Sequence, residues 1–163
     1  PEMKSTGEVM GLDPDLGIAY AKSQMASGSS LPLEGRVFIS VSDAHKSEVA
    51  DLAKRFADLG FKLSSTTGTA AVLAKAGLEV ESVPKLAEGR PNTLDLLKNN
   101  EIQLVINTPS GQAPRADEIK IRTTAIYTNT PIMTTMGSAK AAADGIAALK
   151  RNGYSVKPLQ EYL

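Results

Sequence analysis

A hydroxyl-rich stretch, "SSTTGT" at residues 64–69, lies between an apolar segment and a helical pattern. The hydroxyls of Thr66, Thr67 and Thr69 can donate hydrogen bonds, and Gly68 lets a ligand approach the backbone closely. The start of the helix that follows presents N–H groups and the positive end of the helix dipole. Two interpretations stay open at this point: the threonines cap the helix, or they form an anion site.

Other residues that suit an anion also follow apolar runs. Lys46 ends the string "SVSDAHK" and Lys85 ends "VPK", while "NTPSG" offers Asn107, Thr108 and Ser110. Taken singly, each lysine reads as a solvated side chain and "NTPSG" as a turn. Two cations beside backbone N–H donors, however, are typical of a phosphate site. Whether these residues form one depends on the elements that position them.

Catalytic arrangements find little support in the sequence. The protein has no Cys, and its single His45 lies near Asp43 without a Gly-x-Ser-x-Gly elbow. Neither a Walker-type loop nor Gly-x-Gly-x-x-Gly occurs. No loop offers two carboxylates placed for acid–base work. We therefore predict a binding site, with no catalytic residue and no metal ligand.

From Gly35 onwards, strand and helix patterns alternate five times. This alternation predicts an α/β fold with a roughly five-stranded parallel sheet and helices on both faces. Ligands of such folds bind at the carboxyl ends of the strands, which is where the loops above would meet. The expected strands are 36–42, 61–65, 78–83, 102–108 and 131–135. The expected helices are 45–60, 69–77, 92–100, 116–129 and 138–153.

Residues 1–35 differ from this pattern. They are rich in Gly and Pro, and "DPDLGIAYAKSQMAS" predicts one helix with Asp13 as N-cap and Pro14 at its first position. We expect a boundary near 28–35, with residues 1–30 separate from a domain at 31–163. The last ten residues receive no assignment.

Composition excludes several partners. The 163 residues carry 18 basic and 18 acidic side chains and a formal net charge of zero. Without a basic patch or an aromatic platform, nucleic acid and anionic membrane surfaces are not expected. No apolar run reaches spanning length and no signal peptide is seen, so we expect a cytoplasmic protein. The first residue is Pro1, which suggests a piece of a longer protein.

The motifs resemble a known family. "PEMKSTGEVMGLDPDLGIAYAKSQMAS" is similar to the end of the second ATP-grasp unit of carbamoyl phosphate synthetase large chains. "VFISVSDAHK", "GFKLSSTTGTAAVLAKAG", "VPKLAEGRPNTLDLLKN", "VINTPSG" and "IRTTA" resemble the C-terminal methylglyoxal synthase-like regulatory domain of those large chains. The resemblance covers nearly the whole sequence and implies a three-layer, Rossmann-like fold.

The resemblance implies regulation. In the family, the large chain makes carbamoyl phosphate with ATP and Mg or Mn for pyrimidine and arginine biosynthesis, and a small glutamine amidotransferase chain supplies ammonia. The C-terminal domain needs no cofactor and binds effectors such as UMP, IMP or N-acetylglutamate. Effector-site positions carry over to Lys46, Thr66, Thr67, Gly68, Thr69, Lys85, Asn107, Thr108 and Ser110. Asp117 and Thr134 match positions linked to a second effector or to a homo-oligomer contact.

Some residues depart from the family pattern. Thr67 stands where some nucleotide-regulated members have His, Pro109 stands where a Thr is often found, and Gln112 and Ala113 stand where basic residues are common. These departures leave the effector's identity and sign open. A stand-alone methylglyoxal synthase would need a "GGD" loop, and the related cyclohydrolase domain a "GRVKTLHP"-type run; neither occurs. A purely structural or oligomerisation domain is the remaining alternative.

Overall fold

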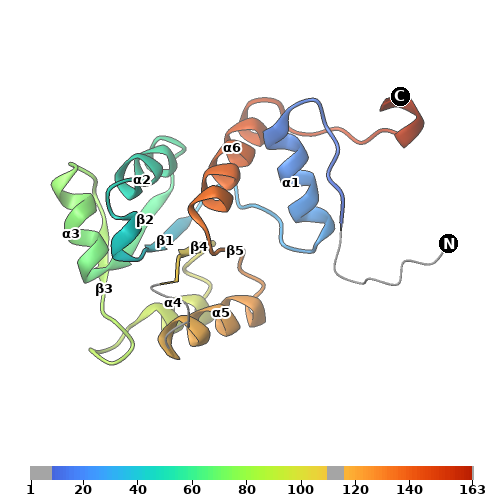
Figure 1. The fold of residues 1–163 in the computed structure, drawn as a ribbon. Coiled ribbons are helices and arrows are strands. Elements are labelled where there is room, and N and C mark those ends of the chain that lie inside the picture. The colour runs from blue at the N-terminus through green and yellow to red at the C-terminus, as the bar shows by residue number, and fades with distance from the viewer. Residues whose placement is uncertain (1–8, 110–115, 163) are drawn as a thin grey trace.

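The computed structural model describes residues 9–109 and 116–162, which form a five-stranded parallel sheet with helices on both faces (Figure 1). The predicted α/β fold is therefore confirmed. The strands are β1 (Arg36–Ser40), β2 (Lys62–Thr66), β3 (Glu81–Val83), β4 (Leu104–Asn107) and β5 (Ile132–Met133). The helices are α1 (Leu16–Ala26), α2 (Val49–Asp58), α3 (Thr67–Lys75), α4 (Thr93–Lys98), α5 (Ala116–Tyr127) and α6 (Met136–Asn152), with short 3-10 turns η1 (Asp43–His45) and η2 (Leu159–Tyr162).

The strand order is β3-β2-β1-β4-β5. Strands β2 and β3 extend the sheet on one side of β1, and β4 and β5 extend it on the other side. Ile39 of β1 pairs with Ser65 of β2 on one side and Ile106 of β4 on the other. The connections that leave β1 and β4 therefore run to opposite faces, and a crevice opens at the carboxyl ends of these two strands.

Side-chain alternation in β1 divides the core into two layers. Val37 and Ile39 lie in a cluster with α2, α3 and α6, whereas Phe38 lies in a second cluster with α4 and α5. Leu104 and Val105 of β4 alternate in the same way. Because both faces are covered, these strands consist almost entirely of apolar residues.

Helix α1 packs along α6 at close range. A Cβ added to Gly17 would lie 2.8 Å from the Asp144 carbonyl oxygen, and one on Gly145 would lie 3.1 Å from the Gly17 carbonyl oxygen. Ile18 of α1 belongs to the same core cluster as α6, and the Tyr20 hydroxyl donates to the Met133 sulfur at 3.2 Å. Burial raises the pKa of the Tyr20 hydroxyl. The division at residue 30 stays a prediction, but α1 shares its core with the sheet.

The start of α1 was predicted two residues too early. Asp15 is the N-cap, and its carboxylate accepts from the Ile18 N–H at 3.0 Å. Asp13 instead accepts from the Asp15 N–H at 3.0 Å. Pro14 lies between these two aspartates and therefore precedes the first helical residue, Leu16.

The helix after β1 also begins later than predicted. Its expected first turn at residue 45 is the 3-10 turn η1, and α2 starts only at Val49. Lys46 therefore ends η1 and does not start α2. Conversely, α3 and α6 begin two residues earlier than predicted, and β1, β3, β4 and β5 are shorter than predicted because strand pairing covers only part of each expected range. Asn92 caps α4, at the position where this helix was expected to begin.

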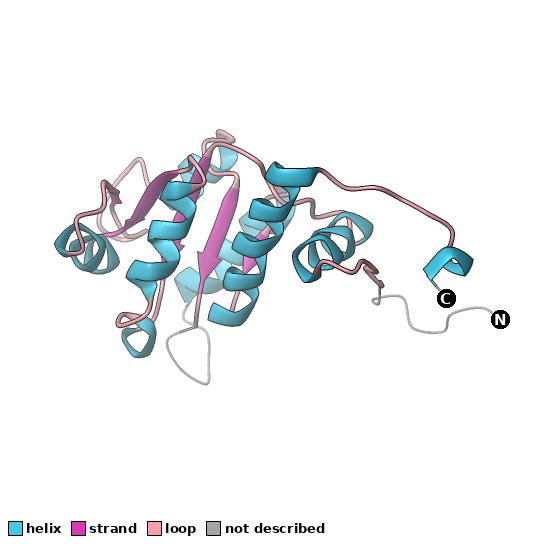
Figure 2. Cartoon of the chain, turned by 90° about the horizontal axis from the view of Figure 1, so that it is seen from above, coloured by secondary structure: helices cyan, strands magenta, loops and turns pink. Residues whose placement is uncertain are grey.

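The final residues leave the sheet altogether. Figure 2 shows residues 154–162 running away from the C-terminal end of α6 to the short turn η2. None of the helices in the described parts of the protein combines the length and the apolar character needed to cross a bilayer.

Candidate functional site

A cavity of about 340 Å³ opens at the carboxyl ends of β1, β2 and β4, where the crevice was expected. This volume is within the range of small-ligand sites. Eight of the residues predicted for a site line it: Lys46, Thr66, Gly68, Thr69, Lys85, Asn107, Thr108 and Asp117. The fold thus brings together residues from five separate segments of the sequence.

The start of α3 forms one wall of the cavity. Thr66 is the N-cap residue in an extended conformation, but among the described residues its side chain makes no capping bond. Its hydroxyl lies 3.4 Å from the Ser40 hydroxyl instead. The first-turn N–H groups of α3 therefore receive no acceptor from the cap side chain. The interpretation of the threonines as a side-chain cap is wrong for Thr66, and the wall can offer N–H donors to an anion.

Lys46 extends over this wall. A Cβ added to Gly68 would lie 3.8 Å from the Lys46 Nζ, so the ammonium group lies against the glycine in the first turn of α3. Lys46 pairs with Asp43 at 2.5 Å across η1. The Lys46 side chain is about one-third exposed and lines the cavity, so its positive charge lies beside the cavity. The ammonium group and the start of α3 thus place hydrogen-bond donors at this end of the cavity, where Asp43 balances the charge of Lys46.

The end of β4 forms the opposite wall. Asn107 is 3% exposed, and its Nδ2 has no hydrogen-bond partner among the described residues. Thr108 is also buried, and its hydroxyl oxygen accepts from the Ser42 N–H at 3.0 Å, which ties the loops after β1 and β4 together. A buried amide donor without a partner is costly, so an acceptor from a ligand would relieve that cost.

Two of the hydroxyls in "SSTTGT" serve the sheet, not the cavity. Ser64 and Ser65 are fully buried in β2. The Ser65 hydroxyl donates to the Ile39 carbonyl at 2.6 Å, and that of Ser64 to the Val37 carbonyl at 3.5 Å. These bonds satisfy polar groups inside the core.

Two predicted residues are not brought to the cavity, and a third lies outside the described residues. Thr67, the first residue of α3, is exposed and does not line it. Thr134 lies between β5 and α6, at the same sheet edge but outside the cavity lining. Ser110 falls in 110–115, outside the described residues. Asp117, expected at a second effector or oligomer contact, instead lines the same cavity as Lys46.

Sequence reasoning missed half of the lining. Ser42 and Asp43 belong to a loop from which only Lys46 was assigned to the site, and Glu118 follows Asp117, which was predicted. The apolar Leu86 and Ile121 were not predicted to line the site, because apolar residues of loops and helices usually pack in the core. The complete set that was not predicted is Ser40, Val41, Ser42, Asp43, Leu86, Thr93, Glu118 and Ile121.

A polar bridge joins η1 to α6 through the residue that precedes α2. Glu48 accepts from the Lys140 Nζ at 2.7 Å and lies 3.1 Å from the His45 Nδ1. The hydrogen bond with Lys140, and to a smaller extent that with His45, lowers the pKa of the Glu48 carboxyl. This bridge supports the turn that carries Lys46. The described residues contain no group of three or more metal-ligating side chains.

Comparison with known proteins identifies the family. A sequence profile of the MGS-like domain matches residues 48–134, more than half of the protein. The chain belongs to the MGS-like domain family. Every cavity residue from α2 onwards up to Ile121 falls within the matched range, whereas α1 and α6 lie outside it.

The relatives that this MGS-like domain matches are much longer proteins, and the domain spans only a part of each. It is 52% identical over 160 residues to the carbamoyl phosphate synthase large chain of Acidobacterium capsulatum, covering 98% of this sequence and 15% of that protein. It is 45% identical over 166 residues to the C-terminal section of the carbamoyl phosphate synthase large chain of Aquifex aeolicus, covering 99% of this sequence and 31% of that protein. The similarity thus extends through α1 and the final residues.

A solved structure confirms the fold. The domain superposes on methylglyoxal synthase from Elizabethkingia anophelis NUHP1 with a TM-score of 0.58 and 17% identity, covering 69% of this protein and 79% of that one. At this identity the likeness concerns the fold only.

Proposed function

We propose that this MGS-like domain is the allosteric effector-binding domain of a carbamoyl phosphate synthase large chain and that its cavity binds a nucleoside monophosphate such as UMP. The observation that carries the proposal is the meeting of three donors in one cavity. These are the Lys46 ammonium, the uncapped start of α3 and the unpartnered Asn107 amide. A phosphate supplies acceptors for all three.

The rest of the cavity suits a nucleoside. Asp117 and Glu118 offer acceptors that match sugar hydroxyls, and Leu86 and Ile121 offer apolar surface for a base. Lys85 lies at the rim, more than half exposed and 3.4 Å from Glu88, so it can turn towards a phosphate at little cost. The acidic and basic sides together favour a ligand with both a phosphate and hydroxyl donors.

Binding would act on the rest of the large chain by linkage. An effector shifts an equilibrium only by its different affinity for the two states, typically about 1–3 kcal/mol. We further propose that the complete protein uses ATP with Mg or Mn, receives ammonia from a small glutamine amidotransferase chain, and works in the cytoplasm in pyrimidine and arginine biosynthesis. The domain itself needs no cofactor in this proposal.

Calorimetric titration of the protein with UMP, IMP and N-acetylglutamate tests the proposal. UMP should bind, and Lys46→Ala should weaken its binding by about 1–3 kcal/mol, the range for a charge-assisted contact. Lys54→Ala is the matched control, because Lys54 is exposed and pairs with Asp58 away from the cavity. Equal affinities for wild type and Lys46→Ala would remove the assigned role of Lys46.

Two other results would replace the proposal. No heat with any of the three effectors at millimolar concentration would favour the structural or oligomerisation role. Formation of methylglyoxal from dihydroxyacetone phosphate would show catalysis. The second result is not expected, because the sequence lacks the "GGD" loop that a methylglyoxal synthase would need.

A further inference from the structure

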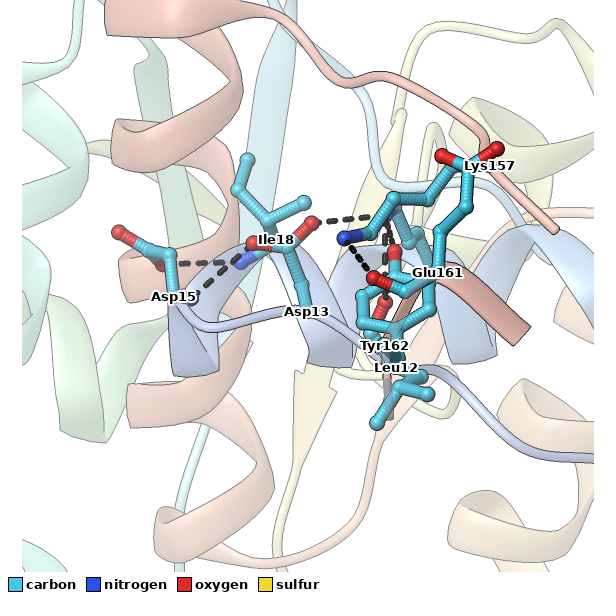
Figure 3. A network of polar contacts seen from close by, with 8 residues as sticks. Leu12, Asp13, Asp15, Ile18, Lys157, Glu161 and Tyr162 are labelled. Atoms are coloured by element: carbon cyan, nitrogen blue, oxygen red, sulfur yellow. Dashed lines mark hydrogen bonds and ion pairs between the residues drawn. The ribbon is translucent and has the colours of Figure 1, made fainter. Parts of the chain in front are cut away.

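The final residues contact the segment that leads into α1. In Figure 3, Lys157, Glu161 and Tyr162 lie beside Leu12 and Asp13, joined by a network of polar contacts. The Tyr162 hydroxyl donates to the Leu12 carbonyl oxygen at 3.1 Å. These two segments are 150 residues apart in the sequence, so the fold and not sequence proximity brings them together.

Lys22 of α1 is the centre of this network. Its Nζ donates to the Asp13 carboxylate at 2.7 Å, to the Leu12 carbonyl at 3.2 Å and to the Tyr162 hydroxyl at 3.2 Å. The side chains of Lys22 and Asp13 are only 14% and 17% exposed. All three donor positions of the ammonium group are therefore used, and the ion pair is shielded from most of the solvent.

Tyr162 is also contacted by Lys157 of its own segment. The Lys157 Nζ lies 4.0 Å from the centre of the Tyr162 ring, within the range of a cation–π contact. The same ammonium donates to the Glu161 carbonyl at 2.9 Å, which closes the turn η2. The ring is thus fixed between its own segment and Lys22.

The network continues into the start of α1. While one oxygen of Asp13 accepts from Lys22, the other accepts from the Asp15 N–H at 3.0 Å. Asp15 in turn caps α1 through the Ile18 N–H. The final segment therefore supports the orientation of Asp13, and Asp13 supports the cap of α1.

Core packing does not explain this contact. Residues 151–161 are exposed, and among the described residues none beyond Leu149 belongs to either core cluster. A segment that buries so little apolar surface adds little to global stability. It instead adds a contact to residues 9–15, which also lie against α1 through Gly11 and Lys22.

We propose that residues 154–162 act as a clasp that holds the lead-in segment, residues 9–15, against α1, with Tyr162 and Lys22 as the positioning residues. Because α1 packs tightly on α6, the clasp makes the lead-in segment one body with the sheet. The further consequence rests on the proposed function: in a large chain, this rigid junction carries the effector signal towards the preceding unit.

Hydrogen exchange at single amides tests the clasp in the protein itself. Tyr162→Phe removes the hydroxyl but keeps the ring, and should speed exchange of the Asp15 N–H by about 2- to 10-fold, the equivalent of about one hydrogen bond. Lys22→Met, which keeps the apolar stem, should have a larger effect. Tyr154→Phe is the matched control in the same segment and should leave this amide unchanged. Equal Asp15 exchange in wild type and Tyr162→Phe would overturn the clasp.

A second measurement uses the complete large chain. Tyr162→Phe should leave UMP affinity unchanged. It should reduce the effect that saturating UMP has on the rate of carbamoyl phosphate synthesis. A full response in a variant lacking residues 154–163 would overturn the signalling consequence. Failure of the wild-type protein to bind UMP would instead overturn the proposed function, and the exchange result would still decide the clasp.

Discussion

Polar groups are paired differently in two regions of the protein. One region is the cavity at the sheet edge, and the other is the junction of α1, α6 and the clasp. At the cavity, the start of α3 lacks a side-chain cap from Thr66 and the Asn107 amide has no partner among the described residues. At the junction, Lys22 uses every donor and Asp13 accepts at both oxygens. Donors left unpaired at one place indicate a ligand, whereas saturated groups at the other indicate a fixed joint.

The strongest way to break the junction is to separate its helices. Gly17→Ala places a Cβ 2.8 Å from the Asp144 carbonyl oxygen, so the backbones must move apart. We expect a loss of about 1–3 kcal/mol in the free energy of unfolding, measured with urea.

A matched glycine in α6 provides the control for this prediction. In the described structure, a Cβ on Gly137 would meet nothing nearer than the Thr135 hydroxyl at 3.9 Å. Gly137→Ala should therefore be neutral or stabilising, because Ala is the better helix former. If Gly17→Ala were as stable as wild type, the close contact of α1 and α6 would not be a fixed joint.

Two buried asparagines sharpen the comparison at the level of single amides. Asn107→Ala removes an unpartnered donor, so the free energy of unfolding should change by less than about 1 kcal/mol. UMP affinity should fall by about 1 kcal/mol, because the ligand loses a donor. Calorimetry and urea unfolding measure the two quantities.

Asn92→Ala should give the reverse pattern. Asn92 accepts from the Leu94 N–H at 3.0 Å in the capping box of α4, and its amide donates to the Gly89 carbonyl at 3.2 Å. Loss of this cap should cost about 1 kcal/mol of stability and leave UMP affinity unchanged. The same pattern for both variants would contradict the distinction between open and saturated amides.

The smallest expected effect concerns pH. The hydrogen bond from Lys22, followed by that from the Asp15 N–H, holds the pKa of the Asp13 carboxyl below its ordinary value of 3.8. The folded protein therefore binds this proton less tightly than the unfolded protein, and the contribution to stability is present above 3.8 and lost as pH falls below it. Asp13→Asn should show a shallower loss of unfolding free energy from about pH 5 to about pH 3. An unchanged slope would show that the pair adds no acid sensitivity.

Sequence reasoning succeeded where a local pattern controls the structure. Alternating apolar periods predicted the parallel sheet and the helices that cover both of its faces. The loops at Lys46 and Asn107 were correctly expected to meet, because parallel strands place their carboxyl ends at one edge. That these residues bind a nucleotide stays a proposal.

The failures have a common cause. Thr66 was a candidate cap by type, yet its hydroxyl faces Ser40 of the neighbouring strand. Thr67 was expected in the site and is exposed, because the helix starts at Thr67 and turns it outward. In each case the residue type alone does not set the orientation: a distant neighbour decides it for Thr66, and the start of the helix decides it for Thr67.

The sequence by itself determined the fold class, the edge at which polar loops gather and the family that the motifs resemble, because these follow from local periodicity and from short strings of residues. Only the tertiary structure decided the strand order, the missing partner of the Asn107 amide and the contact between Tyr162 and Leu12. Such features depend on distances between segments that are 17 to 150 residues apart, which no local pattern encodes.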